Sequence, residues 1–230
     1  MYNNIIQYKD KVLNEILDIN NFTTSYKIMW FDAIYKEIIN GRKNAKIKKL
    51  AAKMVATSFY PIIYGGLNFG EQDKLKDIGL YIKNNFDIDT SENEDYICGY
   101  IMGCKDENLN KMIMNLTKYV PYRLIRPFYK DIIKSKEDEI NKKLSDSQIN
   151  SYIQELSNSN SNIEALYKIN KDTKMIEFNE DWINYIIDNK DMIKELINHT
   201  LISYLEKKNP GDFEIEYKLH PIGAECEVSL

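Results

Sequence analysis

The segment from Asn21 to Ile39 constrains the fold more than any other part of this sequence. Its residues, NFTTSYKIMWFDAIYKEII, place apolar side chains on nearly every side of a helix. A helix that is apolar all round is normally buried between other elements. Thr23 or Thr24 is predicted to cap its start and Gly41 to end it. The pattern therefore predicts a buried helix near the start of the chain.

Helical periodicity recurs along most of the sequence. The predicted helices cover 4–18, 47–60 (ended by Pro61), 71–85, a stretch from Ser91 through Ile101, 107–119, 136–157, a stretch from Asp181, and 190–208. The segment 120–131, VPYRLIRPFYKD, is predicted to be irregular because two prolines bracket it. Apolar and polar residues alternate only around NKDT, which predicts one small β-hairpin near 164–178.

These elements predict a mainly α fold, a multi-helix domain with one small β-hairpin. The polar stretch SNSNSN, residues 157–162, is predicted to be an exposed connector. The expected organisation is a helical domain at 1–156, a hairpin with helices at 163–219, and an irregular tail at 220–230.

Composition excludes several classes of protein. The net charge is -4, so any contact with nucleic acid or with an anionic membrane must come from a local patch. No segment has the roughly 18 uncharged apolar residues of a membrane span, and the N-terminus lacks the apolar core of a signal peptide. Three cysteines and two histidines give neither a disulfide framework nor a Cys/His zinc site. We expect a reduced, cytoplasmic protein without a membrane partner.

The strongest local charge lies in GRKNAKIKKLAAK, which contains Arg42, Lys43, Lys46, Lys48, Lys49 and Lys53 and no acidic residue. With the preceding helix, this segment forms a helix-turn-helix-like unit over about 23–60. In such a unit the first helix is buried and the second lies on DNA. The six cations are predicted to contact DNA phosphates, so replacing Lys46, Lys48 and Lys49 by Ala should remove salt-sensitive binding. A solvated lysine-rich face is the alternative.

Three further cations are candidates for binding an anion or a phosphate. Lys27 lies in the first helical turn, where the helix dipole disfavours a cation, so it needs either a carboxylate partner or an anion. Arg123 and Arg126 are held between Pro121 and Pro127 and could clamp a phosphate or a carboxylate. Internal salt bridges are the alternative for all three.

No constellation of residues indicates catalysis. The glycines of YGGLNFG lack the spacing of a phosphate-binding loop. His199 lies on the flank of a helix, and His220 has no partner nearby in the sequence. The sequence predicts no catalytic residue and no metal ligand.

Several segments together resemble a bacterial family of HNH-endonuclease-like proteins. They are NFTTSYKIMWFDAI at 21–34, LAAKMVATSFYPI at 50–62 followed by NFGEQD at 68–73, VPYRLIRPFY at 120–129, IEFNEDWINYI at 176–186, and LISYLEKKNPGDFEIEYKL at 201–219. In that family, a helical region like this one precedes an HNH module that hydrolyses DNA with a histidine base and a metal.

The resemblance implies an HNH module soon after Leu219, but His220–Leu230 offers one histidine and no asparagine. Metal-assisted hydrolysis needs ligands for the ion and a group that activates water, so no catalytic residue is transferred and a divalent metal is expected only with such a module. A truncated copy and a stand-alone relative both fit.

The expected function is a non-catalytic, DNA-engaging or accessory region of an HNH-type nuclease. One alternative is a helical interaction or regulatory protein of a defence or mobile-element system. Another is a nuclease with an unrecognised metal site.

Overall fold

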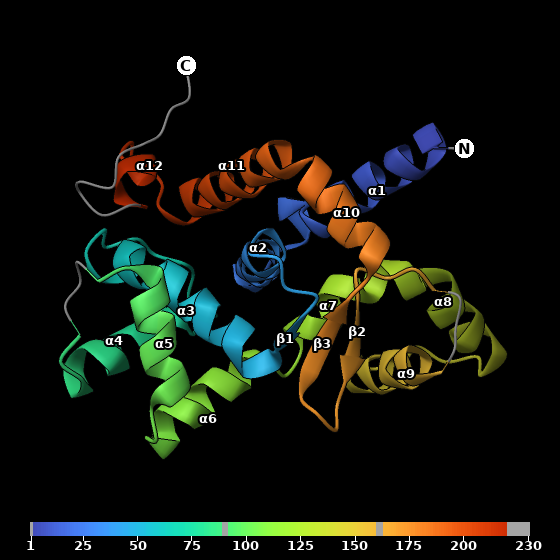
Figure 1. Ribbon diagram of the computed structural model, residues 1–230, viewed down its shortest axis with the longest axis horizontal. Helices are drawn as coiled ribbons and strands as arrows, with labels where there is room; N and C mark the ends of the chain where they lie inside the picture. The colour runs from blue at the N-terminus through green and yellow to red at the C-terminus, as the bar shows by residue number, and fades with distance from the viewer. Residues whose placement is uncertain (1, 89–91, 160–162, 220–230) are drawn as a thin grey trace.

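A computed structural model describes residues 2–88, 92–159 and 163–219, and it is mainly helical, as predicted (Figure 1). The α-helices are α1 Tyr2–Ile16, α2 Tyr26–Ile39, α3 Ile47–Ile63, α4 Leu75–Asn85, α5 Glu94–Gly103, α6 Glu107–Leu116, α7 Val120–Ile125, α8 Lys130–Glu139, α9 Asp146–Asn158, α10 Glu180–Asp188, α11 Lys190–Lys208 and α12 Ile215–Lys218. The 3-10 helices are η1 Ile19–Asn21 and η2 Arg126–Tyr129, and the strands are β1 Asn44–Lys46, β2 Tyr167–Asn170 and β3 Met175–Phe178. The predicted tail at 220–230 lies outside the described residues.

Helix α2 is the buried helix that the sequence predicts. It lies in the middle of the molecule, in contact with α3, α7, α10 and α11 (Figure 1). Ile28, Trp30 and Phe31 are completely buried, and the helical turn of about 100° per residue places them on three different sides of the helix. Because neighbours surround α2, an apolar residue is favourable at almost every position along it.

The start of α2 differs from the prediction. Ser25 is the N-cap residue, in place of Thr23 or Thr24, and its side chain makes no capping hydrogen bond. Instead, the Ser25 hydroxyl and backbone N–H both donate to the Asp73 carboxylate, at 2.6 and 3.0 Å. The helix start is therefore held by a residue 48 positions away, which a local capping pattern does not reveal.

The predicted hairpin is confirmed as β2 and β3, and a third strand joins it. The sheet has the order β1-β3-β2 with antiparallel pairs, and Ala45 lies opposite Ile176. Strand β1 occupies the connection between α2 and α3, the pair predicted to be helix-turn-helix-like. Strand β1 comes from the predicted first domain and β3 from the predicted second domain. The two predicted domains therefore share one sheet and one hydrophobic core.

Three helical predictions are wrong. Pro61 does not end the helix predicted at 47–60, because it lies inside α3, which continues to Ile63. The segment predicted to be irregular is helical: α7 and η2 lead directly into α8. Pro121 and Pro127 each lie in the first two positions of their helix, where a backbone N–H has no intrahelical acceptor. The single helix predicted at 136–157 is two helices, because α8 ends at Glu139 and Ser145 forms a capping box with Gln148 at the start of α9.

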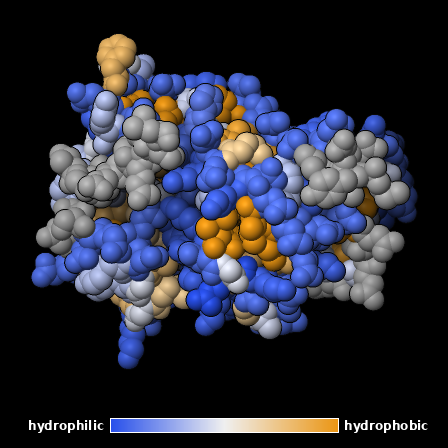
Figure 2. Space-filling view, turned by 45° about the horizontal axis from the view of Figure 1, so that its top comes forward, coloured by the Kyte–Doolittle hydropathy of each residue, from blue (hydrophilic) through white to orange (hydrophobic). Residues whose placement is uncertain are grey.

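The surface is largely hydrophilic, with a compact apolar patch near the centre of the face shown in Figure 2. Within the described ranges, none of the helices combines the length and the apolar character that crossing a membrane requires.

Candidate anion-binding cleft

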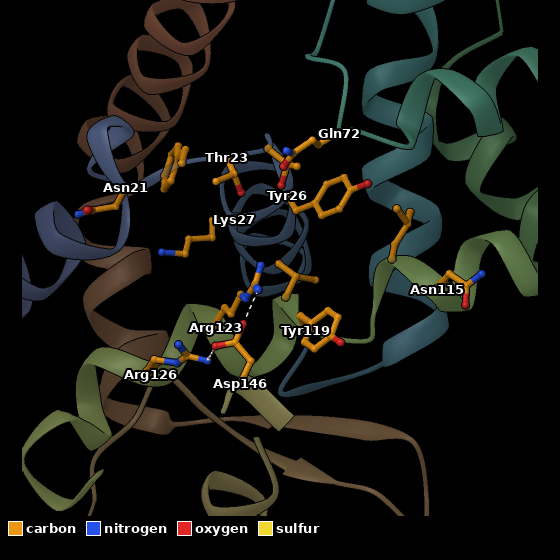
Figure 3. A pocket seen from close by; sticks show the side chains of 14 residues that line it. Asn21, Thr23, Tyr26, Lys27, Gln72, Asn115, Tyr119, Arg123, Arg126 and Asp146 are labelled. Atoms are coloured by element: carbon orange, nitrogen blue, oxygen red, sulfur yellow. Dashed lines mark hydrogen bonds and ion pairs between the residues drawn. The ribbon is translucent and has the colours of Figure 1, made fainter. Parts of the chain in front are cut away.

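A cleft of about 430 Å³ lies between the start of α2, the region joining α6 to α7, and the start of α9 (Figure 3). We call it the inner cleft. A second cavity of about 470 Å³, here called the α8 groove, continues from it along α8. Lys27, Arg123 and Arg126 line both cavities. These three residues, the cationic junction, are thus brought together by the fold, although the sequence separates Lys27 from the two arginines.

The two arginines are held by one carboxylate. Arg123 and Arg126 lie three residues apart on the helical run of α7 and η2, so they share a face. Their guanidinium groups donate to the two oxygens of Asp146 at 2.5 and 2.9 Å (Figure 3). The hydrogen bond from Arg123, followed by that from Arg126, holds the pKa of Asp146 below its ordinary value of 3.8. All three side chains keep about a third of their surface exposed, so the cluster remains open to a ligand.

Lys27 has no such partner. Among the described residues, no carboxylate oxygen lies within 4.0 Å of its Nζ, and the Nζ lies 5.6 Å from the centre of the Phe22 ring. Burial lowers the pKa of Lys27, and the charges of Arg126 and Arg123 lower it further. The internal ion pair considered for this lysine is therefore not formed within the described part of the chain. A nearby anion would stabilise the charged form of its ammonium group.

Arg126 also has unused hydrogen-bonding capacity. Its Nε is buried and has no hydrogen-bond partner among the described residues. A buried donor without an acceptor costs about 1–3 kcal/mol. A ligand reaches this atom only if the Arg126 side chain moves.

The lining of the two cavities is strongly basic compared with the whole molecule. The α8 groove adds Lys130, Lys134 and Lys143 to the junction. Together the cavities contain these six cations against three carboxylates, those of Glu15, Glu137 and Asp146, whereas the whole chain has a net charge of -4. Lys130 lies 3.6 Å from Glu15 and Lys143 lies 2.6 Å from Glu137, so part of this charge is already paired. The positive charges still outnumber the negative ones, and a concave surface with such an excess attracts an anionic ligand.

In the basic segment after α2, two of the lysines pair with a buried carboxylate. Lys49 and Lys53 both pair with Glu37, at 2.7 and 3.4 Å, and the Glu37 side chain is only 3% exposed. Lys53 is itself buried and also lies 3.6 Å from Asp95. Two of the six predicted DNA contacts therefore have acidic partners inside the protein. The sequence signal for this pairing was Glu37, an acidic residue near the end of the largely apolar helix α2.

The other four cations of that segment lie nearer the surface. Lys43 pairs with Glu180 at 3.2 Å, and Lys48 donates to the Met102 carbonyl at 3.5 Å. Arg42 and Lys46 are exposed, and within the described residues neither has an ion pair. Arg42, Lys49 and Lys53 line one cavity, and they share it with the carboxylates of Glu37 and Asp95.

Other candidate groups add no further chemistry. His199 is exposed on α11, and His220 lies outside the described residues. Within the described part of the chain, no group of three or more His, Cys, Asp or Glu residues is placed to hold a metal ion.

Of the residues that line the inner cleft, sequence reasoning identified only Lys27, Arg123 and Arg126, and it missed others such as Phe22, Tyr119 and Asp146. Asp146 follows the capping residue Ser145, and the SDSQ sequence was the signal that would have placed it at a helix start. Nothing in the sequence indicates that this helix start faces α7.

Comparisons with protein-family models, with curated proteins and with solved structures give no match. The cleft is therefore interpreted from its own geometry and charge.

Proposed function

We propose that this chain binds the phosphate groups of nucleic acid at the cationic junction. It would act as a non-catalytic, DNA-engaging region of an HNH-type nuclease system. The observation that carries this proposal is the convergence of Lys27, Arg123 and Arg126 on one cleft with a single carboxylate, Asp146, among them.

The chemistry of the junction fits a phosphate. Guanidinium groups donate paired hydrogen bonds to carboxylate and phosphate oxygens alike. Asp146 therefore occupies, with its two oxygens, the same donors that a phosphate would use. An arriving phosphate would also meet Lys27, which lines the same cleft and has no ion pair among the described residues.

The resemblance to HNH-endonuclease-like proteins supports the same site. Three of the segments that carry the resemblance, 21–34, 68–73 and 120–129, contribute to the inner cleft through Lys27, Gln72 and Arg123. These segments are distant in sequence, and the cleft is where they meet.

The cleft is a better candidate than the basic segment for the main contact. Lys49 and Lys53 would have to leave Glu37 in order to bind DNA. The buried Glu37 carboxylate would then have no positive charge to compensate it, which is costly. Arg42 and Lys46 remain free to add peripheral contacts.

Fluorescence anisotropy with labelled DNA across a salt series tests the proposal. The affinity should fall with salt, with a log–log slope of about -0.9 for each phosphate contacted in a duplex and about -0.7 in a single strand. Lys27→Met should weaken binding and make the slope shallower. Lys76→Ala is the matched control, because Lys76 is an exposed lysine of α4 that lines neither cavity. Salt-independent binding, or equal affinity in Lys27→Met and wild type, would refute the proposal.

A further inference from the structure

The two cavities on either side of the cationic junction have different linings. Apart from the junction, the inner cleft has neutral polar side chains such as Gln72 and Asn115, and the aromatic rings of Phe22, Tyr26 and Tyr119 (Figure 3). Among the described residues, the lining of the α8 groove adds three lysines and no aromatic ring, and two of these lysines pair with Glu15 and Glu137. A ligand that spans both cavities therefore has an aromatic or neutral part and a separate, anionic part.

Aromatic rings and cations are paired in the inner cleft. The Lys27 Nζ lies 5.6 Å from the centre of the Phe22 ring, and the Arg123 Cζ lies 5.0 Å from the centre of the Tyr119 ring. Proteins that bind single-stranded nucleic acid combine aromatic rings, on which bases stack, with arginine and lysine along the backbone. Both components are present within this one cleft.

The α8 groove provides a linear set of cations. Arg123, Arg126, Lys130 and Lys134 recur at intervals of three and four residues along α7, η2 and α8, and all four line the groove. At a rise of about 1.5 Å per residue in an α-helix and about 2.0 Å in a 3-10 helix, neighbouring cations are separated by about 4.5–8 Å along the helical run. This arrangement suits a ligand with several phosphates in a row better than a single free phosphate.

We infer that the site takes a single-stranded nucleic acid, with one unstacked base in the inner cleft and its backbone phosphates along the α8 groove. This inference rests on the proposed function and adds the class of ligand. A paired base in a duplex has its faces covered by its neighbours, so it reaches an aromatic wall only after leaving the stack. A single strand presents its bases without that cost.

The amide side chains of the cleft fit this position for a base. Gln72 and Asn115 are exposed and line the inner cleft, where they can donate and accept hydrogen bonds. The edge of an unpaired base offers both donors and acceptors to such groups.

The test uses the full 230-residue chain and three labelled 12-nucleotide probes at one salt concentration. They are a single strand, the same strand in a duplex, and a single strand with abasic sites that keeps every phosphate but lacks the bases. The intact single strand should bind about tenfold more tightly than the abasic strand, as expected for the stacking of about one base. It should also bind more tightly than the duplex. Equal affinity for all three probes would overturn the inference.

Variants of the aromatic wall give a second test. Tyr119→Ala should weaken binding of the intact strand by about tenfold and leave binding of the abasic strand unchanged, whereas Tyr119→Phe should bind like wild type. Tyr96→Ala is the control, because Tyr96 is 47% exposed on α5 and lines neither cavity. Equal losses for both strands would assign Tyr119 a structural role and count against base stacking.

The outcomes separate this inference from the proposed function. If the inference alone fails, the duplex and abasic probes bind as well as the intact strand, and Lys27→Met weakens all three. If the proposed function fails, Lys27→Met binds every probe as wild type does.

Discussion

Lys27 has a positive charge that the described residues do not neutralise, in the first turn of a helix and beside two arginines. Such a position disfavours the charge, so Lys27→Met should leave the free energy of unfolding unchanged or raise it by up to about 1 kcal/mol at pH 7. Urea denaturation measures this difference. A clear loss of stability would show that Lys27 has a structural role.

The lowered pKa of Lys27 also predicts the direction of a pH effect. Between this pKa and the ordinary value of 10.5, the unfolded chain binds more protons at this site than the folded chain. The wild-type free energy of unfolding should therefore rise with pH in that interval relative to Lys27→Met. Parallel urea titrations of the two proteins from pH 8 to pH 10.5 would detect the difference.

Asp146 competes with the proposed ligand for Arg123 and Arg126. Asp146→Asn should weaken this partly exposed pairing and cost no more than about 1 kcal/mol of stability at pH 7. The same change should increase the affinity for single-stranded DNA several-fold, since it removes a negative charge from the cleft. Glu139→Gln is the control, because Glu139 pairs with Lys136 outside both cavities. Weaker DNA binding by Asp146→Asn would show that Asp146 positions the arginines and does not compete with the ligand.

The acid response of Asp146 has a definite sign. The pKa of Asp146 is lowered in the folded state. Its contribution to the free energy of unfolding is therefore fully present above pH 3.8, and it is lost as the pH falls through the lowered pKa. Asp146→Asn should therefore lose less stability than wild type in acid, which unfolding followed by circular dichroism would measure.

At the scale of elements, one buried tyrosine joins three of them. Trp30 Nε1 on α2 donates to the Tyr167 hydroxyl on β2 at 3.1 Å, and this hydroxyl donates to the Pro121 carbonyl on α7 at 2.5 Å. This chain of hydrogen bonds fixes α7, and with it Arg123, against the helix that carries Lys27.

Tyr167→Phe removes the hydroxyl and leaves two buried polar groups without partners. The free energy of unfolding should fall by about 2–3 kcal/mol, as expected for unpaired buried groups. Tyr81→Phe is a matched control with a smaller expected loss, because the Tyr81 hydroxyl makes one partly buried hydrogen bond, to Asp106 at 3.2 Å. Similar losses in the two variants would contradict a special role for the Tyr167 link.

Gly65 shows a close approach between elements. A Cβ atom there would lie 2.6 Å from the Lys218 carbonyl oxygen of α12 and 2.7 Å from that of Pro61 in α3. Gly65→Ala should therefore displace the backbone and destabilise the protein by about 1–3 kcal/mol. Gly99→Ala is the opposite control: its Cβ would meet open space within α5, and it should stabilise by about 0.5–1 kcal/mol. Thermal unfolding of both variants would measure the contrast.

The sequence predicts the elements that have a long, regular pattern. The buried helix α2 and the hairpin β2–β3 follow directly from their spacing of apolar residues. Strand β1 does not, because only Ala45 of its three residues is buried and alternation cannot be recognised over so short a segment. The break between α8 and α9 is hidden because Ile140 and Leu144 keep a helical spacing of four residues.

The sequence indicates each cation of the cationic junction separately, but it does not show that the three lie in one cleft. Lys27, Arg123 and Arg126 each stand out in the sequence, the first by its place in a helix and the others by two flanking prolines. Their convergence depends on the packing of α7 against α2, which is a contact between distant segments. The role of Glu37 in neutralising Lys49 and Lys53 depends on α2 and α3 in the same way.

At the scale of the whole molecule, the distribution of charge matters more than its sum. The chain has a net charge of -4, yet six cations face three carboxylates around the two cavities. A net negative protein with a locally basic cleft repels polyanions in most orientations. Binding should therefore centre on this cleft and should be strongly salt dependent.

Replacing Lys46, Lys48 and Lys49 together by Ala compares the two basic regions directly. If the cleft is the main contact, this variant should keep its affinity for single-stranded DNA within about threefold of wild type, the size of a peripheral electrostatic effect. It should nevertheless be less stable by about 1–3 kcal/mol, since Glu37 is buried and would retain only Lys53. Anisotropy and urea denaturation on the same preparations separate the two effects. A loss of binding larger than that of Lys27→Met, in a variant that is still folded, would move the main contact to the segment after α2 and leave the cleft a secondary site.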